Sequence, residues 1–167
     1  GGNLRMTPIA ATLALSHLER IDELIARKAY NVGHLTDRLC QLPGLTPAAT
    51  RPDCDLGARF GVHVVYDERV LGRPRENILL ELRSAGLKVG GPQTEPLHRL
   101  ALFSGERVLA PLPGPSRGLR FGYKARQFPI AERLAQSWLS LPADYLYGHA
   151  DRLIDDYAHA FGRVLSR

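Results

Sequence analysis

The chain has 167 residues, of which 44% are hydrophobic and 23% are charged, and its net charge is +5. This length can bury a core, and the composition is that of a globular protein rather than a disordered one. No stretch approaches the roughly eighteen consecutive apolar residues that cross a bilayer, and no signal segment precedes the first helix, so we expect no membrane association and a cytoplasmic location.

The positive charge is concentrated between residues 99 and 133, where seven basic residues against two acidic ones account for the whole net charge of +5. No aromatic-rich strand, helix-turn-helix pattern or zinc-finger spacing accompanies this segment. The charge therefore indicates a solvated or interface-facing loop rather than a nucleic-acid site. Cys40 and Cys54 are too few for a disulfide framework and have no metal-ligand spacing, so we predict ordinary thiols and no metal site.

A long helix is expected to begin at about residue 8. Thr7 is a favourable N-cap, and Pro8 suits the first helical position. Apolar residues then recur at three- and four-residue steps as far as Leu39, which predicts one amphipathic helix that ends before Pro43. Gly33 marks a position where this helix could kink or break.

The remainder of the chain, residues 43–167, is predicted to form a compact α/β domain. Turn residues, β-branched runs and helical periodicity indicate the elements. In chain order they are an irregular stretch over 42–57, a strand at 61–66, a helix from Pro74 that ends before Gly86, a strand at 87–89, a Gly- and Pro-rich loop over 90–115, a strand at 119–122, and helices at 131–139 and 151–166.

The segment Gly2-Asn3-Leu4-Arg5-Met6-Thr7-Pro8 presents an amide and a guanidinium beside a helix N-terminus. Free N–H groups and the helix dipole at that position suit a phosphate or another anion. In the alternative interpretation, Asn3 caps a turn and Arg5 pairs with a surface carboxylate.

Short motifs in a consistent order resemble the DegT/DnrJ/EryC1/StrS family of pyridoxal-phosphate-dependent sugar aminotransferases, and the resemblance covers essentially the whole chain. These motifs are Asn3–Thr7, the helix that carries Leu18–Leu24, Leu42–Leu45, the helix from Arg75 to Gly86, Pro96–His98 with Phe103, Phe128–Leu134 and Leu139–Pro142.

The resemblance implies the C-terminal small domain of a fold type I transferase, an α/β (α+β) unit over residues 43–167, with residues 1–42 forming the motif segment and a long linking helix. In family members the lysine that binds pyridoxal 5'-phosphate lies upstream, in a large domain. Lys28, Lys88 and Lys124 match no such position, so we assign no catalytic residue and expect the chain alone to be inactive. The implied partner is a large-domain polypeptide bearing that lysine, or a homologous aminotransferase subunit.

The resemblance also implies roles for three residues. Asn3 would reach across a dimer interface to the partner's cofactor phosphate, and Arg5 would lie near the substrate. His98 would approach the substrate pocket, although a lone histidine in a loop is as often structural. A basic segment that includes Lys124 could meet the diphosphate of a sugar nucleotide.

The implied activity is transfer of an amino group from Glu or Gln to a keto sugar, carried as a sugar nucleotide, or to a keto-cyclitol. Two alternatives stay open: a pyridoxal-phosphate-dependent sugar dehydratase, in which the cofactor lysine is replaced, and a non-catalytic, degenerate aminotransferase-like interaction module. Because the apolar face of the first helix lacks a partner in this chain, we expect the chain made alone to aggregate.

Overall fold

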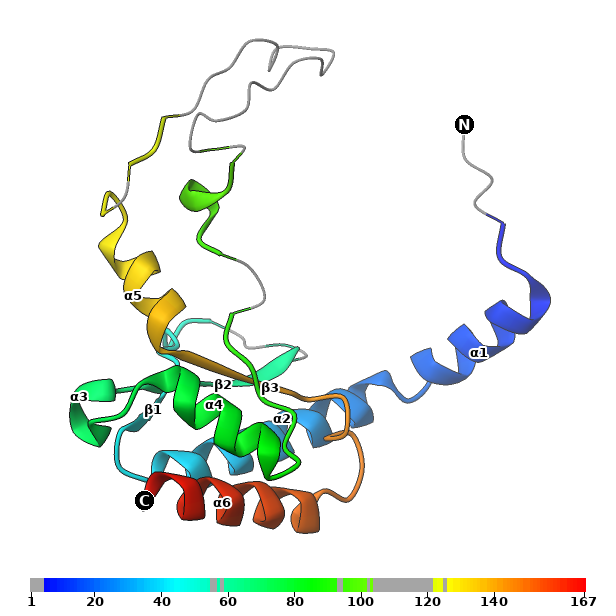
Figure 1. Cartoon of the computed structure of the whole chain (residues 1–167). Helices are drawn as coiled ribbons and strands as arrows, with labels where there is room; N and C mark the ends of the chain where they lie inside the picture. Colours follow the sequence, from blue (N-terminus) through cyan, green and yellow to red (C-terminus); the bar gives the residue numbers. More distant parts are fainter. Residues whose placement is uncertain are drawn as a thin grey trace.

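The structure is a computed structural model that describes residues 5–54, 57, 59–92, 95–101, 103, 122–124 and 126–167. A small sheet is covered by helices on one face, and a helical arm projects from this body (Figure 1). The elements are α1 (Pro8–Leu18), α2 (Ile21–Cys40), β1 (Leu45–Pro47), β2 (Gly61–Tyr66), α3 (Glu68–Leu71), α4 (Arg75–Ser84), the 3-10 helix η1 (Leu97–Arg99), α5 (Pro129–Ser137), β3 (Trp138–Pro142) and α6 (Asp151–Leu165).

The sheet has three antiparallel strands in the order β1-β2-β3. The central strand β2 is the β-branched run predicted at 61–66, and the prediction is confirmed. Its register places Val64 opposite Leu139 on β3 and Tyr66 opposite Leu45 on β1. Because side chains alternate along a strand, these four side chains share one face, and all four are buried.

Helices α2, α4 and α6 cover that face of the sheet, and the core lies between the two layers (Figure 1). Both α4 and the C-terminal helix α6 were predicted close to their observed bounds. Gly86 follows α4 with φ +87°, so it is the left-handed residue after the helix that the sequence predicts. The largest fully buried side chains are Val32, Leu39, Val62, Val64, Ile78, Leu82, Leu139, Leu141, Leu146, Ile154 and Phe161.

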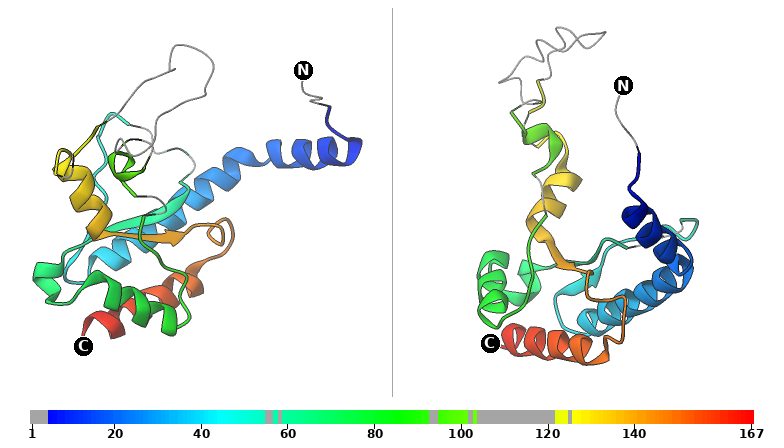
Figure 2. Two further views of the ribbon diagram at one scale, coloured as in Figure 1. Left: turned by 45° about the horizontal axis from the view of Figure 1, so that its top comes forward. Right: turned by 90° about the vertical axis from the view of Figure 1, so that its right-hand side faces the viewer.

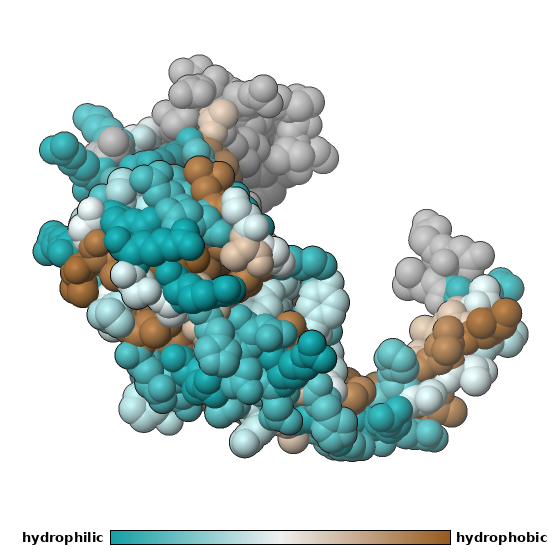
Figure 3. Space-filling view, turned by 60° about the horizontal axis from the view of Figure 1, so that its bottom comes forward, coloured by the Kyte–Doolittle hydropathy of each residue, from teal (hydrophilic) through white to brown (hydrophobic). Residues whose placement is uncertain are grey.

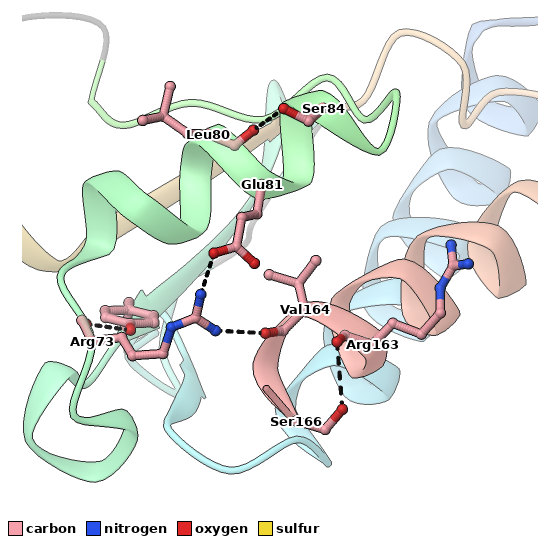
Figure 4. A network of polar contacts seen from close by, with 8 residues as sticks. Arg73, Leu80, Glu81, Ser84, Arg163, Val164 and Ser166 are labelled. Carbon is pink, nitrogen blue, oxygen red and sulfur yellow. Dashed lines mark hydrogen bonds and ion pairs between the residues drawn. The ribbon is translucent and has the colours of Figure 1, made fainter.

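Arg73 fastens the loop before α4 to both neighbouring helices (Figure 4). One end of its guanidinium donates to the carbonyl oxygen of Val164 over 2.8 Å, and the other end pairs with Glu81. Its own carbonyl oxygen accepts a hydrogen bond of 2.6 Å from the hydroxyl of Tyr66. Arg73 therefore joins the sheet, α4 and the C-terminal end of α6.

The single long helix predicted from residue 8 is wrong, because the helix is interrupted at Glu19 and Arg20. Arg20 has φ −119° and ψ 4°, outside the helical range, and α2 starts at the next residue. The predicted weak point, Gly33, lies inside α2. Its neighbours Val32 and Leu35 are buried in the core, and their packing outweighs the low helix propensity of one glycine.

The predicted strand at 87–89 is also wrong. Leu82 accepts a hydrogen bond from the N–H of Leu87, and the Val89 carbonyl oxygen accepts one from Arg83 Nε at 2.9 Å, so neither group joins the sheet. Contact with the sheet begins one residue later, where Gly90 and Ser140 exchange two backbone hydrogen bonds of 2.8 Å.

Two strands lie outside the predicted ones. The short strand β1 falls within the stretch predicted to be irregular, and β3 begins at Trp138, where a helix to residue 139 was expected. Leu139 and Leu141 are both buried, and their spacing of two residues is the pattern of a strand. The helix predicted at 131–139 included Leu139, and so this pattern was missed. The predicted strand at 119–122 falls largely outside the described residues.

Helix α1 extends away from the body (Figure 2) and buries none of its residues. Apolar side chains lie on all sides of it, and they form the hydrophobic surface along the arm (Figure 3). A helix that is apolar all round is normally buried on all sides. Helix α1 is therefore suited to contacts with protein surface beyond this chain.

Candidate functional site

The first predicted site lies at the N-terminus of α1. The Thr7 hydroxyl accepts from the N–H of Ala10 over 3.2 Å and caps the helix as predicted, with Pro8 in the first turn. Arg5 is exposed two residues before this cap. Asn3 lies outside the described residues. The described part of the segment thus places a guanidinium close to a helix N-terminus, where an anion would be favoured.

The second site centres on His98 in η1. His98 is buried, and its Nε2 lies 2.9 Å from Oε1 of Glu132, a residue of the first turn of α5. The Glu132 side chain is itself only 12% exposed. His98, which the sequence suggested as a pocket residue, thus ties η1 to α5.

Two further groups bind the same carboxylate. The main-chain N–H of Arg126 donates to Oε1 over 2.7 Å, and Nη2 of Arg99 lies 3.1 Å from Oε2. The Arg126 N–H, followed by His98 and Arg99, lowers the pKa of Glu132 below its usual 4.5. Glu132 is therefore an ionised acceptor at neutral pH. Because an ionised carboxylate only accepts, His98 Nε2 carries a hydrogen.

The turn that carries Arg126 is closed by reciprocal hydrogen bonds. The N–H of Gln127 donates to the Lys124 carbonyl oxygen over 3.3 Å, and Oε1 of Gln127 accepts from the N–H of Lys124 over 3.1 Å. Arg126 has φ +68°, the one positive φ of a non-glycine residue in the described part of the chain. This left-handed backbone costs about 1–2 kcal/mol for an ordinary residue, and here it aims the N–H at Glu132.

Aromatic rings pack around His98. The Phe128 ring centroid lies 5.0 Å from the imidazole centroid, and Tyr123 meets Phe128 edge-on with centroids 5.5 Å apart. The N–H of Tyr123 also donates to the carbonyl oxygen of Phe103 over 3.3 Å. Phe103 and Tyr123, which are far apart in sequence, therefore meet close to α5.

The other end of α5 is held by Arg75, the first residue of α4. Its Nη1 donates to the carbonyl oxygens of Ala135 over 2.7 Å and Trp138 over 3.3 Å. These carbonyls have no intrahelical partner at a helix C-terminus, so the guanidinium caps α5. Glu132 and Arg75 thus fix α5 at its two ends.

A shallow groove of about 270 Å³ lies between η1 and α5. Its lining is apolar apart from Glu95, so it offers little to a phosphate. The residues that line it are Pro92, Glu95, Pro96, Leu97, Ala131, Leu134, Ala135 and Trp138.

The three lysines of the chain lie in different surroundings. Lys28 is 4% exposed and donates to the hydroxyl of Tyr147 over 2.9 Å. Lys88 pairs with the hydroxyl of Tyr145, and Lys124 lies exposed in the turn described above.

Sequence reasoning missed Glu132 and Arg75 as organising residues. Both belong to motifs that were noted, but an acidic residue in a first helical turn and an arginine at a helix start are too common to be singled out. In the described part of the chain, no group of three His, Cys, Asp or Glu side chains is placed to hold a metal ion. No helix there is both long and apolar enough to cross a bilayer.

The sequence model of the DegT/DnrJ/EryC1/StrS aminotransferase family matches residues 1–158. L-glutamine:scyllo-inosose aminotransferase of Streptomyces griseus is 31% identical over 175 residues, covering 99% of this chain and 39% of that protein. Putative L-glutamine:3-amino-2,3-dideoxy-scyllo-inosose aminotransferase of Streptoalloteichus tenebrarius is also 31% identical, over 81% of this chain and 33% of that protein. The chain thus spans between a third and two fifths of the length of these relatives.

Among solved structures, the aminotransferase from Psychrobacter cryohalolentis superposes with a TM-score of 0.71 at 17% identity, covering 99% of this chain and 40% of the other. The expected fold class is thereby confirmed: over the part it covers, the chain has the α/β fold of these enzymes.

Proposed function

This chain belongs to the DegT/DnrJ/EryC1/StrS aminotransferase family, and we propose that it is the C-terminal part, or a separate subunit, of a pyridoxal-phosphate-dependent aminotransferase. The enzyme transfers an amino group from glutamine or glutamate to a keto-cyclitol or a keto sugar. The observation that carries this proposal is the 31% identity to L-glutamine:scyllo-inosose aminotransferase across 99% of this chain.

The surroundings of the three lysines support the proposal that another part of the enzyme holds the cofactor. Lys28 and Lys88 are engaged with tyrosine hydroxyls, and Lys124 lies in an exposed turn. We therefore assign the cofactor lysine to a large domain that is not in this chain. When bound there, pyridoxal phosphate supplies an electron sink for the carbon that exchanges its amino group.

Residues at the start of this chain would bind the anionic and polar groups at that site. Arg5 precedes the capped N-terminus of α1 and is exposed, as a residue that contacts a substrate or phosphate has to be. For Asn3, the support is the family segment in which it stands, and its proposed partner is the cofactor phosphate across a dimer interface. The positive end of the α1 helix dipole favours the same dianion.

His98 would form part of the wall of the substrate site. Its imidazole is buried against Phe128 and Glu132, so its contribution is to shape the wall together with Arg99 and the aromatic side chains around it. Pocket walls that combine aromatic surface with a few fixed polar groups suit a hydroxylated ring.

Native mass spectrometry combined with absorbance tests the proposal. The assembly that contains this chain is expected to carry a visible cofactor band that borohydride abolishes and fixes to a lysine outside residues 1–167. In that assembly, Asn3→Ala should weaken cofactor retention, and Arg5→Ala should raise KM for scyllo-inosose with glutamine as donor. Arg152→Ala on the exposed side of α6 is the matched control. A homodimer without the band would overturn the proposal.

A second enzyme function is favoured by one likeness. GDP-4-keto-6-deoxy-D-mannose-3-dehydratase from E. coli superposes with a TM-score of 0.70 at 16% identity, covering 96% of this chain and 36% of the other. Residues upstream of this chain would decide between amino transfer and dehydration, so assaying the assembly for loss of a substrate hydroxyl separates the two. A non-catalytic interaction module would show neither reaction and no cofactor band.

A further inference from the structure

Glu132 is the one side chain in the described residues that bonds to η1 and to the turn before α5 at once. Its Oε1 accepts from the N–H of Arg126 over 2.7 Å and lies 2.9 Å from His98 Nε2, while Oε2 lies 3.1 Å from Arg99 Nη2. We call Glu132, His98, Arg99 and the Arg126 N–H the Glu132 clamp. His98 and Glu132 lie 34 positions apart in sequence.

We propose that Glu132 is a positioning residue of the substrate site: it holds the 97–99 and 126–128 segments together against α5 and orients His98. The expected effect of Glu132 on substrate kinetics rests on the proposed function. Its expected effect on the order of the two segments does not.

Burial gives most weight to the bond between His98 and Glu132. The side chains of His98 and Glu132 are 6% and 12% exposed, so water cannot readily replace either partner. A buried group that loses a charged hydrogen-bond partner is destabilised far more than an exposed one. Removing the Glu132 carboxylate would leave the buried imidazole without its acceptor and would also release the exposed Arg126 N–H.

The carboxylate also determines the orientation of His98. Because Glu132 is ionised, Nε2 is the nitrogen that donates to it, and in the neutral ring Nδ1 is then the acceptor. The ring plane is fixed by Phe128, whose centroid lies 5.0 Å away. Glu132 and Phe128, both at the start of α5, thus set the position, the ring plane and the tautomer of the imidazole.

The backbone around Arg126 is consistent with a clamp rather than a chance contact. The left-handed φ of +68° at Arg126 is unfavourable for a residue with a side chain. It persists where surrounding bonds require it, and the bond that uses its N–H is the one to Glu132. The adjacent reciprocal bonds between Lys124 and Gln127 fix the turn that presents this N–H.

The capping of α5 by Arg75 explains why Glu132 can serve as the fixed point. Arg75 holds the C-terminal end of α5 through Ala135 and Trp138, and β3, which follows directly, is paired with the central strand. Glu132 therefore stands on an element tied to the core, and the two segments that it binds are positioned relative to that core.

Hydrogen–deuterium exchange of the full chain in its assembly tests the structural part. Glu132→Ala should speed exchange at 97–99 and 126–128 together, by about ten- to a hundred-fold for the loss of a charge-assisted bond, with α2 and α6 unchanged. Asp156→Asn, an exposed carboxylate on α6, should change neither. Faster exchange in one segment alone, or in neither, would overturn the clamp.

A conservative variant keeps the test decisive if Glu132→Ala unfolds the domain. Glu132→Gln can keep an oxygen at the Oε1 position, which serves both the Arg126 N–H and His98, but it then turns an N–H donor toward Arg99. It should therefore show a smaller effect in the same two segments. If Glu132→Gln loosened the whole domain instead, the residue would be a general packing element and the proposal would be wrong.

Kinetics with scyllo-inosose and glutamine test whether Glu132 acts through His98. Glu132→Gln and His98→Ala should each raise KM with little change in kcat and an unchanged cofactor spectrum. Because the two act as one unit, the double variant should be no worse than the more severe single variant. Additive effects would overturn the assignment. An assembly inactive toward this pair would instead count against the proposed function, and the exchange result would still decide the clamp.

Discussion

Ile9 and Leu13 lie one turn apart on α1, and their side chains are 76% and 60% exposed. Leu18, at the end of the helix, is 63% exposed. A contiguous exposed apolar surface of this kind marks a contact surface or an aggregation hazard. In the proposed enzyme, α1 would be covered by the large domain.

The isolated chain is expected to self-associate through α1. The triple variant Ile9→Gln, Leu13→Gln, Leu18→Gln should remain monomeric to at least about ten-fold higher concentration, because roughly 1.5–3 kcal/mol of burial per side chain is no longer available to association. Light scattering after size-exclusion chromatography measures this. The control is Phe60→Gln, Val70→Gln, Leu80→Gln, which removes equally exposed but scattered apolar side chains. A monodisperse wild-type monomer would contradict the prediction.

Arg75 is expected to contribute to stability as the C-cap of α5. Arg75→Ala should lower the free energy of unfolding by about 1–3 kcal/mol, because two half-buried carbonyl oxygens lose a charged donor. Arg75→Lys should recover only part of it, since one ammonium cannot reproduce the geometry of the guanidinium. Urea unfolding of the polar α1 triple variant measures both. An Arg75→Ala variant as stable as Arg152→Ala would show that water replaces the cap.

Asn31 joins α2 to the turn before α6. It is 4% exposed, and its Nδ2 donates to the carbonyl oxygens of Leu146 over 2.8 Å and Gly148 over 2.9 Å. Asn31→Ala should cost about 1–3 kcal/mol, and Asn31→Asp should cost more, because a carboxylate would face two acceptors. Urea unfolding again measures the change, with the exposed Asn77→Ala as the control. Equal stability of Asn31→Asp and wild type would refute this role.

The sequence predicts the helical layer and the central strand well, because their signals are local. Thr7-Pro8 caps α1, and Gly86 ends α4. The run at 61–66 is β-branched, and α6 has a regular apolar stripe. Each of these features depends on neighbours within a few residues.

The remaining features depend on contacts between distant residues. Leu139 and Leu141 become strand residues because β2 lies beside them, and Val89 is withheld from the sheet by Arg83. In the candidate site, His98 was identified from a motif, but its partner Glu132 lies 34 residues away. No feature of the sequence near His98 or Glu132 predicts that the two residues are in contact.

His63 is expected to make the stability of the domain depend on pH. Its ring packs against Trp138 with centroids 5.1 Å apart, and its Nδ1 is buried with no hydrogen-bond partner among the described residues. Burial lowers the pKa of His63 below its ordinary 6.5. The neutral ring therefore suits this place, and the charged ring does not.

The sign of the effect follows from proton binding. As the pH falls through 6.5, the ordinary value, the unfolded chain takes up a proton at His63 before the folded chain does, so acid favours unfolding. The loss grows until the pH reaches the lower pKa of the folded state and then levels off. His63→Phe keeps a flat ring against Trp138 but has no proton to bind. The difference in urea midpoint between wild type and this variant, measured from pH 8 to pH 5, should therefore shift against wild type with acidification. A difference that stays constant over this range would mean that the ring is protonated equally in both states.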